Sequence, residues 1–361
     1  MNYAARVEAA RALMAKRGLD AMLASVGADL PYFTGYTAMP LERLTMLVLP
    51  VSGPTVLVVP ELEAPRVVEH PGVFEIRPWA EAEDPVRIVT DLLGSAHRVA
   101  IGDQTWATFL LQFQERLPEV MFVQASFLTA ELRIRKDPSE IDLLRQAGAA
   151  ADRVAVRLAQ TQFSGRTERA LSRLIADMLL EEGHDKVDFA IVGSGPNGAS
   201  PHHEASDRVM GRGDAVVCDF GGALGGYFSD TTRMFVVGEV PEGFAQPFTV
   251  LRRAQAAAVD AVRPGVTAQS IDAVARRIIT DGGYGEFFIH RTGHGIGLDI
   301  HEHPYIVEGN DTVLEPGMTF SIEPGIYLPG RFGMRIEDIV AVTDDGVERL
   351  NQSSRDLVTV R

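Results

Sequence analysis

The stretch AVVCDFGGALGGYFSDTTR, residues 215–233, decides the fold of the second half of the chain. An apolar run ends at Asp219, a glycine-rich turn follows, and Asp230 lies eleven residues further on in a second run. This pattern predicts strands near 214–220 and 226–237 in a curved antiparallel sheet with glycine-rich turns. Unpaired charge is unfavourable inside an apolar strand, so both carboxylates are expected to have a special role.

Three more side chains stand in equally unusual surroundings. His294 lies between two glycines in the run RTGHGIG, Glu323 lies in SIEPG and Glu337 lies in RIED. Together with Asp219 and Asp230 they supply four carboxylates and one imidazole, whose charge of −4 balances two divalent cations. The set therefore has the composition of a two-metal site.

The residue types also indicate which ions and which reaction to expect. Mainly oxygen ligands favour a hard ion such as Mn²⁺, with Co²⁺ or Zn²⁺ as alternatives, over a thiolate-held structural zinc. Five side chains are too few for two separate closed sites, but they suffice for two ions about 3.5–4 Å apart that share carboxylates and a water. Such a pair acidifies water and polarises a carbonyl, which favours hydrolysis. The competing interpretation is a set of unrelated acids, since the chain has 49 Asp and Glu residues.

At these five residues the chain resembles the pita-bread metallopeptidase family, which contains methionine aminopeptidase, aminopeptidase P and prolidase. The similarity is strong from about residue 136 to the C-terminus, and no ligand is substituted. That argues against the family's metal-free creatine hydrolases and its non-catalytic members. The resemblance implies that Asp219 chelates one ion, that His294 and Glu323 complete the site of the other, and that Asp230 and Glu337 bridge the two.

Histidines extend the resemblance, because six of the nine fall into two short stretches. By the resemblance, His202 in the run SPHH and His301, seven residues after the ligand histidine, donate hydrogen bonds to the scissile carbonyl and then to the oxyanion. His290, four residues before the ligand histidine, is expected to line the proline pocket. The remaining two, His203 and His303, are interpreted as structural.

Two residues of the ligand motifs have a further expected role. The resemblance makes Glu323 the general base that takes a proton from the nucleophilic water, which bound metal has already acidified. Arg335 stands two residues before Glu337, so on one strand both side chains would face the same side. Arg335 is therefore expected to hold the bridging carboxylate and to contribute to substrate binding. The alternative is a surface arginine.

Composition agrees with a globular protein of two domains, since 46% of the 361 residues are hydrophobic. A net charge of −15 argues against a nucleic-acid partner and suits the cytoplasm. The single cysteine, Cys218, excludes an intrachain disulfide framework, and on a strand it would face away from Asp219 into the core. The N-terminus lacks the apolar core of a signal peptide, and prolines break the longest apolar stretch, so no membrane partner is expected.

The first part of the chain alternates helix and strand patterns, which predicts an α/β domain over residues 1–130. Its helices are expected at 3–17, 84–94 and 105–117, and its strands near 20–24, 44–50, 55–59 and 98–101. The domain resembles the creatinase-type N-terminal domain found in prolidase and aminopeptidase P. A linker at 131–138 is expected to lead into the catalytic pita-bread domain at 139–361.

The start of the second domain is marked by a helix signal. Asp137, Pro138 and Glu140 form a capping-box pattern that predicts a helix to about Gln160. Further elements are expected as a strand at 188–193 and helices at 167–182, 245–262 and 268–281, the last two covering the outer face of the curved sheet. The expected fold class is thus α/β (α+β).

These features predict a cytoplasmic, homodimeric metallopeptidase that cleaves Xaa-Pro bonds in small peptides, favouring an Xaa-Pro dipeptidase (prolidase). The alternatives are an aminopeptidase P acting on longer peptides, a broader aminopeptidase of the same fold, and a non-catalytic peptide-binding protein. A dipeptidase needs a fixed cation for the free carboxylate of its substrate. We assign this role to Arg43, with Glu42 nearby, in the glycine- and proline-containing segment 33–43. The alternative for Arg43 is a solvated loop arginine.

Overall fold

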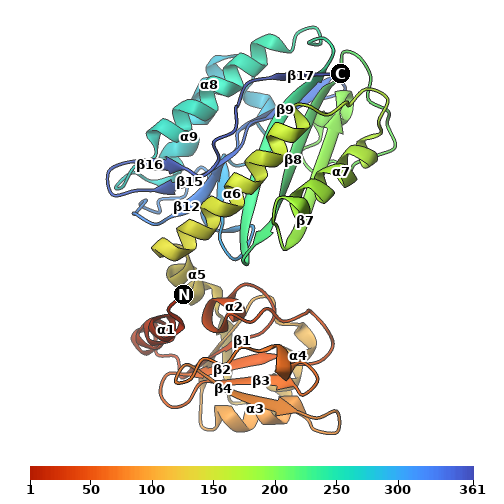
Figure 1. Cartoon of the computed structure of the whole chain (residues 1–361). Coiled ribbons are helices and arrows are strands. Elements are labelled where there is room, and N and C mark those ends of the chain that lie inside the picture. The colour runs from red at the N-terminus through yellow and green to blue at the C-terminus, as the bar shows by residue number, and fades with distance from the viewer. The chain divides into compact units, whose positions relative to one another are not determined.

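The computed structural model describes residues 1–361 and divides into two compact units, Met1–Arg133 and Ile134–Arg361 (Figure 1). Each unit has its own strands and its own apolar core, and the mixed α/β class expected from the sequence is confirmed. Helix α5 (Ser126–Arg133) ends the first unit, and α6 (Pro138–Leu158) begins five residues later. The domain boundaries at 130 and 138 stay a prediction.

Unit 1 is built on a six-stranded mixed sheet in the order β4-β3-β2-β1-β5-β6. Its strands are β1 (Ala21–Ala24), β2 (Met46–Pro50), β3 (Val56–Pro60), β4 (Glu75–Trp79), β5 (Arg98–Ile101) and β6 (Met121–Gln124). Its helices, besides α5, are α1 (Tyr3–Arg17), α2 (Asp29–Thr34), η1 (Ala64–Arg66), α3 (Pro85–Leu93) and α4 (Ala107–Arg116). The sheet buries Leu23, Val58 and Val99 against Val89 of α3 and Phe113 of α4.

Unit 2 contains three groups of strands in the orders β17-β9-β8-β7, β11-β10-β12-β15-β16 and β13-β14. The strands are β7 (Lys186–Ser194), β8 (Ala215–Leu224), β9 (Tyr227–Val237), β10 (Gly293–Gly295), β11 (Glu302–Ile306), β12 (Thr319–Ile322), β13 (Gly325–Leu328), β14 (Phe332–Arg335), β15 (Asp338–Val342), β16 (Val347–Arg349) and β17 (Val358–Val360). The helices that follow α6 are α7 (Glu168–Glu181), η2 (Gly195–Ala199), α8 (Ala245–Ala261), α9 (Ala268–Asp281) and η3 (Gly285–Phe287).

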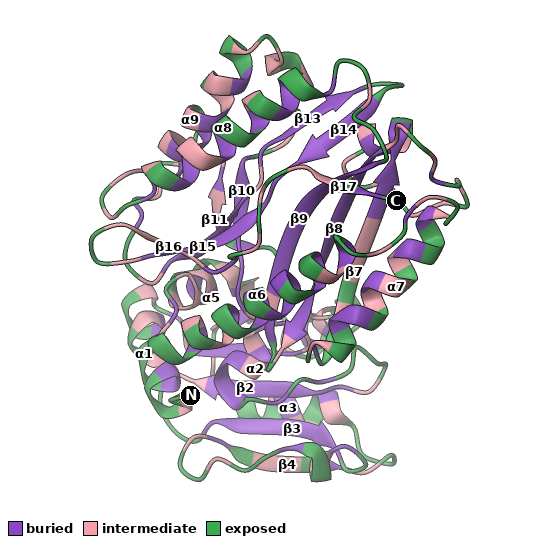
Figure 2. Ribbon diagram, turned by 45° about the horizontal axis from the view of Figure 1, so that its top comes forward, coloured by how far each residue is buried: buried purple, intermediate pink, exposed green.

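Strands β8 and β9 are buried almost throughout (Figure 2), and alternation sorts their side chains onto two faces. On one face, Val216, Cys218 and Phe220 pack into an apolar cluster with α6 and α7. On the other face, Val217 belongs to a cluster with α8, α9 and strands β12 to β14. Asp219 shares the face of Val217, so its carboxylate is directed between the strand groups. The expectation that Cys218 lies in the core is confirmed.

Four helices flank these strands as two pairs. Helices α6 and α7 pack on β7, β8 and β9, whereas α8 and α9 pack on the side of β12 to β14. The sequence predicts that α8 and α9 cover the sheet, but it does not show that α6 and α7 form a second covering pair.

At the start of α6 the expected capping box is present: the Asp137 side chain accepts from the Glu140 backbone N–H at 3.0 Å, and Glu140 Oε2 accepts from the Asp137 N–H at 2.8 Å. None of the helices combines the length and hydropathy that a membrane crossing requires.

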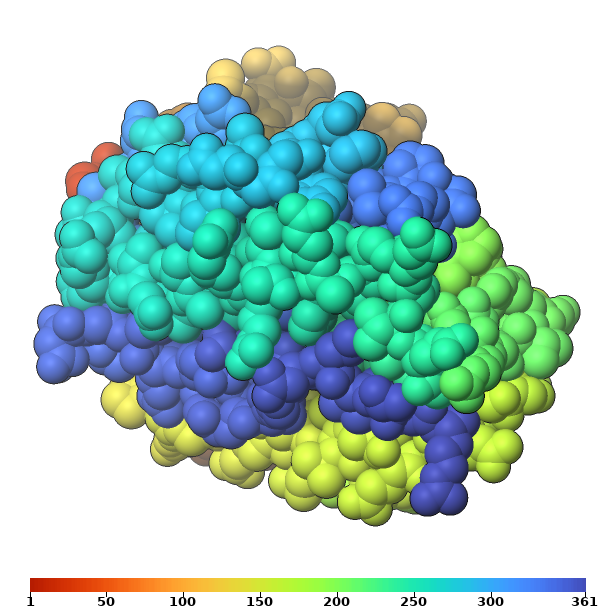
Figure 3. Space-filling view, turned by 90° about the horizontal axis from the view of Figure 1, so that it is seen from above, coloured from red at the N-terminus to blue at the C-terminus, as the bar shows by residue number.

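The C-terminal segment lies along α8 on one face of unit 2 (Figure 3). Arg355 Nη1 donates to Gln255 Oε1 at 2.6 Å, and Arg252 pairs with Asp356 at 2.7 Å. The chain then adds β17 to the sheet edge, parallel to β9. The final residues are therefore tied into the same sheet that carries Asp219 and Asp230.

Candidate active site

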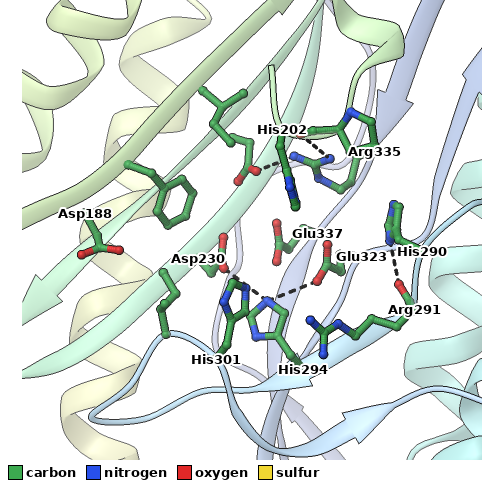
Figure 4. A pocket seen from close by; sticks show the side chains of 15 residues that line it. Asp188, His202, Asp230, His290, Arg291, His294, His301, Glu323, Arg335 and Glu337 are labelled. Carbon is green, nitrogen blue, oxygen red and sulfur yellow. Dashed lines mark hydrogen bonds and ion pairs between the residues drawn. The ribbon is translucent and has the colours of Figure 1, made fainter. Parts of the chain in front are cut away.

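A cavity of about 450 Å³ in unit 2 brings together every residue expected to bind metal or to donate to the substrate carbonyl (Figure 4). It is lined by Asp219, Asp230, His294, Glu323 and Glu337, and by His202, His290 and His301. Arg335 also lines this cavity. The volume falls within the range typical of small-molecule sites.

The antiparallel pair β8–β9 positions the two aspartates. Asp219 is opposite Thr232 and Asp230 is opposite Gly221, so the carboxylates project from neighbouring positions of one face. A Cβ at Gly221 would meet the Ser229 carbonyl oxygen at 2.1 Å, so a larger residue would push the strands apart. Gly221 is thus required because β8 and β9 approach each other closely at this point.

His294 is held by strand β10 in a crowded place. A Cβ at Gly293 would lie 1.8 Å from the Ser321 carbonyl oxygen, and one at Gly295 would lie 2.3 Å from the His303 carbonyl oxygen. The His294 backbone N–H donates to Ser321 Oγ at 3.0 Å, and that hydroxyl donates to Glu323 Oε1 at 3.1 Å. Gly293 therefore lets β12, which leads to Glu323, lie directly against β10, and Gly295 does the same for β11.

The ligand side chains converge closely. His294 Nε2 lies 3.2 Å from Glu323 Oε1 and 3.6 Å from Asp230 Oδ2. One potential ligand atom from each of Asp230, His294 and Glu337 lies within 4.8 Å of the others. Asp219 and Glu323 lie outside this group of three, and Asp219 Oδ2 accepts from Arg335 Nη2.

The electrostatics of this cluster favour bound cations. Burial raises the pKa of Asp219 and raises the pKa values of Asp230 and Glu337 well above their ordinary range, and repulsion between the carboxylates adds to the effect. Burial would also raise the pKa of Glu323, but the hydrogen bond and charge of His294, together with His290 and Arg335, outweigh it and lower the pKa to about 2. Asp219 Oδ1 is buried without a hydrogen-bond partner. A buried acceptor of this kind fits a cation as its missing partner.

The structure corrects the expected position of Arg335. Strand β14 ends at Arg335 and β15 begins at Asp338, so Glu337 lies between strands and the rule of alternating side chains does not link the two residues. Arg335 donates instead to Asp219, to Thr232 Oγ1 at 3.0 Å and to Tyr327 Oη at 2.8 Å. The Thr232 hydroxyl in turn donates to Glu337 Oε2 at 2.7 Å. Arg335 therefore holds Asp219 directly and Glu337 only through Thr232.

The three non-ligand histidines lie around the cluster (Figure 4). The His301 ring lies edge-on to His294, with the ring centroids 4.1 Å apart. Although His301 is accessible from the cavity, the surrounding protein and then the charge of His294 lower its pKa to about 4. Burial also lowers the pKa of His290, whose Nε2 lies 2.9 Å from the Tyr327 hydroxyl. Both rings are thus favoured as neutral imidazoles near pH 7. His202 enters the cavity directly after Pro201.

The remaining expected residues lie elsewhere. Arg43 belongs to unit 1, where its guanidinium donates to Glu81 at 2.7 Å and to Glu42 at 2.9 Å. Its role as a carboxylate anchor stays a prediction. His203 Nε2 donates to Glu168 at 2.8 Å, and His303 packs against Tyr305 on β11, with ring centroids 4.9 Å apart.

Metallopeptidase family M24 matches residues 142–344, and the Creatinase/Prolidase N-terminal domain matches residues 6–135. The chain belongs to metallopeptidase family M24. Its resemblance to that family, and the creatinase-type character of the first domain, are thereby confirmed. Membership implies a peptidase that uses divalent metal ions, in agreement with the cluster of Asp230, His294 and Glu337.

Individual M24 relatives cover nearly the whole chain. It is 47% identical to the probable dipeptidase PepE of Mycobacterium tuberculosis over 99% of this chain and 96% of the relative. It is 36% identical to the Xaa-Pro dipeptidase of Lactobacillus delbrueckii subsp. lactis over 95% of both. The crystal structure of prolidase from Thermococcus sibiricus matches with a TM-score of 0.95 at 39% identity and covers 100% of both chains.

Sequence reasoning missed one buried carboxylate of this M24 site, Glu168 at the start of α7. It is fully buried and accepts hydrogen bonds from the backbone and hydroxyl groups of Ser194 and Ser206, from Asn197 Nδ2, and from His203 at distances of 2.6–3.1 Å. Burial would raise the pKa of Glu168, but these bonds outweigh it and lower the pKa to about 2. All the donors belong to segment 194–206, which carries His202. The nearby pair His202–His203 is the signal that could have pointed to this anchor.

We expect Glu168→Gln to lower kcat by about 10- to 100-fold, because a displacement of about 1 Å in a catalytic group has an effect of that size. The glutamine amide would set an N–H group against donors that need an acceptor. If Glu168 acts through His202, Glu168→Gln should have little further effect on kcat in a His202→Ala background. Independent, multiplying effects in this double-mutant cycle would contradict that role. Thermal unfolding of each variant controls for global loss of structure.

Proposed function

We propose that this M24 protein is an Xaa-Pro dipeptidase that uses two divalent metal ions. The observation that carries the proposal is the convergence, in one cavity, of the complete set of four carboxylates and one imidazole with three further histidines. The names of the relatives, dipeptidase and Xaa-Pro dipeptidase, support the substrate class. The intact cluster argues against a non-catalytic peptide-binding protein.

The residues present fit such a metal pair. Asp219 would hold one ion, His294 and Glu323 would complete the site of the other, and Asp230 and Glu337 would bridge them. Oxygen-rich coordination favours Mn²⁺, with Co²⁺ or Zn²⁺ as alternatives. When bound, the pair lowers the pKa of a shared water and polarises the scissile carbonyl.

The side chains of the chain supply the remaining chemistry. Glu323 accepts the proton of the nucleophilic water at its carboxylate, in line with its position beside His294 and Ser321. His202 and His301 donate to the carbonyl oxygen of the substrate and then to the oxyanion. His290 lines the proline side, where the Tyr327 hydroxyl orients its ring.

The main alternative is an aminopeptidase P, or a broader aminopeptidase, acting on longer peptides in the same site. The two differ in whether the free carboxylate of the substrate is recognised. We also propose that the protein is a homodimer, as the resemblance implies. We place it in the cytoplasm, which the high net negative charge and the absence of a cysteine pair support.

Chelation of the metals should abolish peptidase activity, and Asp219→Asn or Glu337→Gln should do the same. Losing one of four negative charges leaves the two cations insufficiently neutralised, so metal affinity should fall together with the rate. Metal content per chain and hydrolysis of Xaa-Pro dipeptides are measured side by side. Asp344→Asn, at an exposed carboxylate away from the cavity, is the matched control. Near-normal turnover by metal-free protein would refute the two-metal proposal.

Alanine at His202 or at His301 should lower kcat by about 10²–10³-fold while the metal content stays unchanged, because each removes a donor to the oxyanion. The exposed His303, which lies outside the cavity lining, provides the control variant His303→Ala. Loss of metal from the His202 variant would show that this residue is a ligand and not a donor to the substrate.

Arg43→Ala should raise KM for Xaa-Pro dipeptides far more than for Xaa-Pro-Yaa tripeptides if Arg43 binds the free carboxylate. Steady-state kinetics with both peptide lengths measures this, and equal effects on both would count against the assignment. Faster cleavage of tripeptides by the unmodified enzyme would favour aminopeptidase P.

A further inference from the structure

Two charged side chains of the cavity are not used by the mechanism above. Apart from the ligand cluster and the histidines, the charged residues in its lining are Asp188, Arg291 and Arg335. Arg335 is buried and already donates to Asp219, Thr232 and Tyr327. Asp188 and Arg291 are exposed, and they lie on opposite sides of the ligand cluster (Figure 4). The cavity therefore has an acidic end and a basic end.

Arg291 marks the basic end. Its guanidinium lies over the Tyr305 ring, 4.5 Å from the ring centroid, and donates no hydrogen bond within the chain. An arginine stacked on an aromatic ring keeps its N–H groups free for a planar partner such as a carboxylate. Arg291 directly follows His290, the residue assigned to the proline side of the site.

Asp188 marks the acidic end. In the pairing of β7 with β8 the register shifts between Val187 and Phe189, so Asp188 is the extra residue of a β-bulge. Bulges of this kind redirect a side chain next to a site. Its carboxylate accepts a hydrogen bond from Lys186 Nζ at 2.9 Å. The Lys186 side chain is two-thirds exposed, so this ion pair is weak.

The wall beside Asp188 is apolar. Phe189 and Ile191 follow Asp188 on β7 and line the cavity, and Ile300, in the loop before His301, lines it as well. A side chain with an apolar stem and a cationic tip matches such a wall with a carboxylate at its edge. Lysine and arginine side chains have this form.

We propose that Arg291 binds the free carboxylate of the proline residue and that Asp188 binds the cationic tip of a basic N-terminal residue, which makes Lys-Pro and Arg-Pro dipeptides the preferred substrates. This inference rests on the proposed Xaa-Pro dipeptidase function. The two opposite charges orient the dipeptide so that its peptide bond crosses the ligand cluster. Arg291 also provides, inside unit 2, the cation that the sequence interpretation assigns to Arg43.

The Asp188 part is tested with Lys-Pro, Leu-Pro and Glu-Pro as substrates of the metal-loaded enzyme. Wild-type kcat/KM should be about fivefold higher for Lys-Pro than for Leu-Pro, the size expected for one partly exposed ion pair. Asp188→Asn should remove this preference, and Asp188→Lys should reverse it in favour of Glu-Pro. Unchanged ratios in both variants would overturn the assignment of Asp188.

The Arg291 part is tested with Leu-Pro and with its C-terminal amide, which lacks the carboxylate. Arg291→Gln should raise KM for Leu-Pro by about 10- to 100-fold and leave KM for the amide unchanged, because a charged hydrogen bond is lost only in the first case. Arg331→Gln is the matched control, since Arg331 is also exposed and stacks on an aromatic ring, Phe332, but lies outside the cavity lining.

Arg43→Ala, measured in the same assay, provides the decisive comparison. If that variant and not Arg291→Gln loses selectivity for the free carboxylate, the assignment of Arg291 is overturned and that of Arg43 is supported. If every variant cleaves all three dipeptides with unaltered selectivity, the inference is refuted but the proposed Xaa-Pro dipeptidase function is not. Metal-loaded protein that cleaves no Xaa-Pro peptide refutes the proposed function and the inference with it.

Discussion

Mutual repulsion among four carboxylates gathered in one cavity, three of them buried, is the constraint on which the rest of unit 2 depends. Burial and repulsion both oppose ionisation of Asp219, Asp230 and Glu337. Within the chain, Arg335 compensates part of this charge by contact with Asp219. Arg233 helps to hold Glu337 in place, since it donates to the Glu337 carbonyl oxygen at 2.6 Å and to the adjacent Asp338 carboxylate at 2.7 Å. The remaining negative charge explains why the fold suits divalent cations and why a neutral replacement of any one carboxylate disturbs the whole set.

A second layer of buried charge fixes the three segments that carry the cavity histidines. Glu168 holds segment 194–206, as described above. Asp272 on α9 accepts from Thr292 Oγ1 at 2.7 Å and pairs with Arg276, which donates to the His290 carbonyl oxygen at 3.1 Å. The Lys136–Glu302 pair, 2.6 Å apart and buried, lies beside the loop that contains His301. Each histidine therefore stands on or beside a segment that is held by a separate buried acid, which limits its movement without using the imidazole itself.

The sequence reveals local features of the site better than distant ones. Asp219 and Asp230 were predictable because an acid in an apolar strand is unusual, and the capping box at Asp137 because its signal spans four residues. Glu168 could not be recognised in the same way, because its donors lie 26–38 residues away and meet it only in the folded chain. The assumption that one strand carries both Arg335 and Glu337 was wrong, because β14 ends at Arg335 and β15 begins only at Asp338. In unit 1, β4 and β6 escaped prediction because they are short strands that are partly exposed, and β4 contains a proline.

The position of Cys218 gives the molecule an internal reporter of its own opening. Its thiol points away from Asp219 into the cluster shared with α6 and α7, and burial raises its pKa. A buried, protonated thiol is inert towards alkylating reagents, which attack the thiolate. Since Cys218 is the single cysteine of the chain, labelling occurs only when β8 separates from these helices. The rate at which the native protein takes up a thiol reagent therefore measures how often the strand beneath the metal-binding carboxylates comes loose.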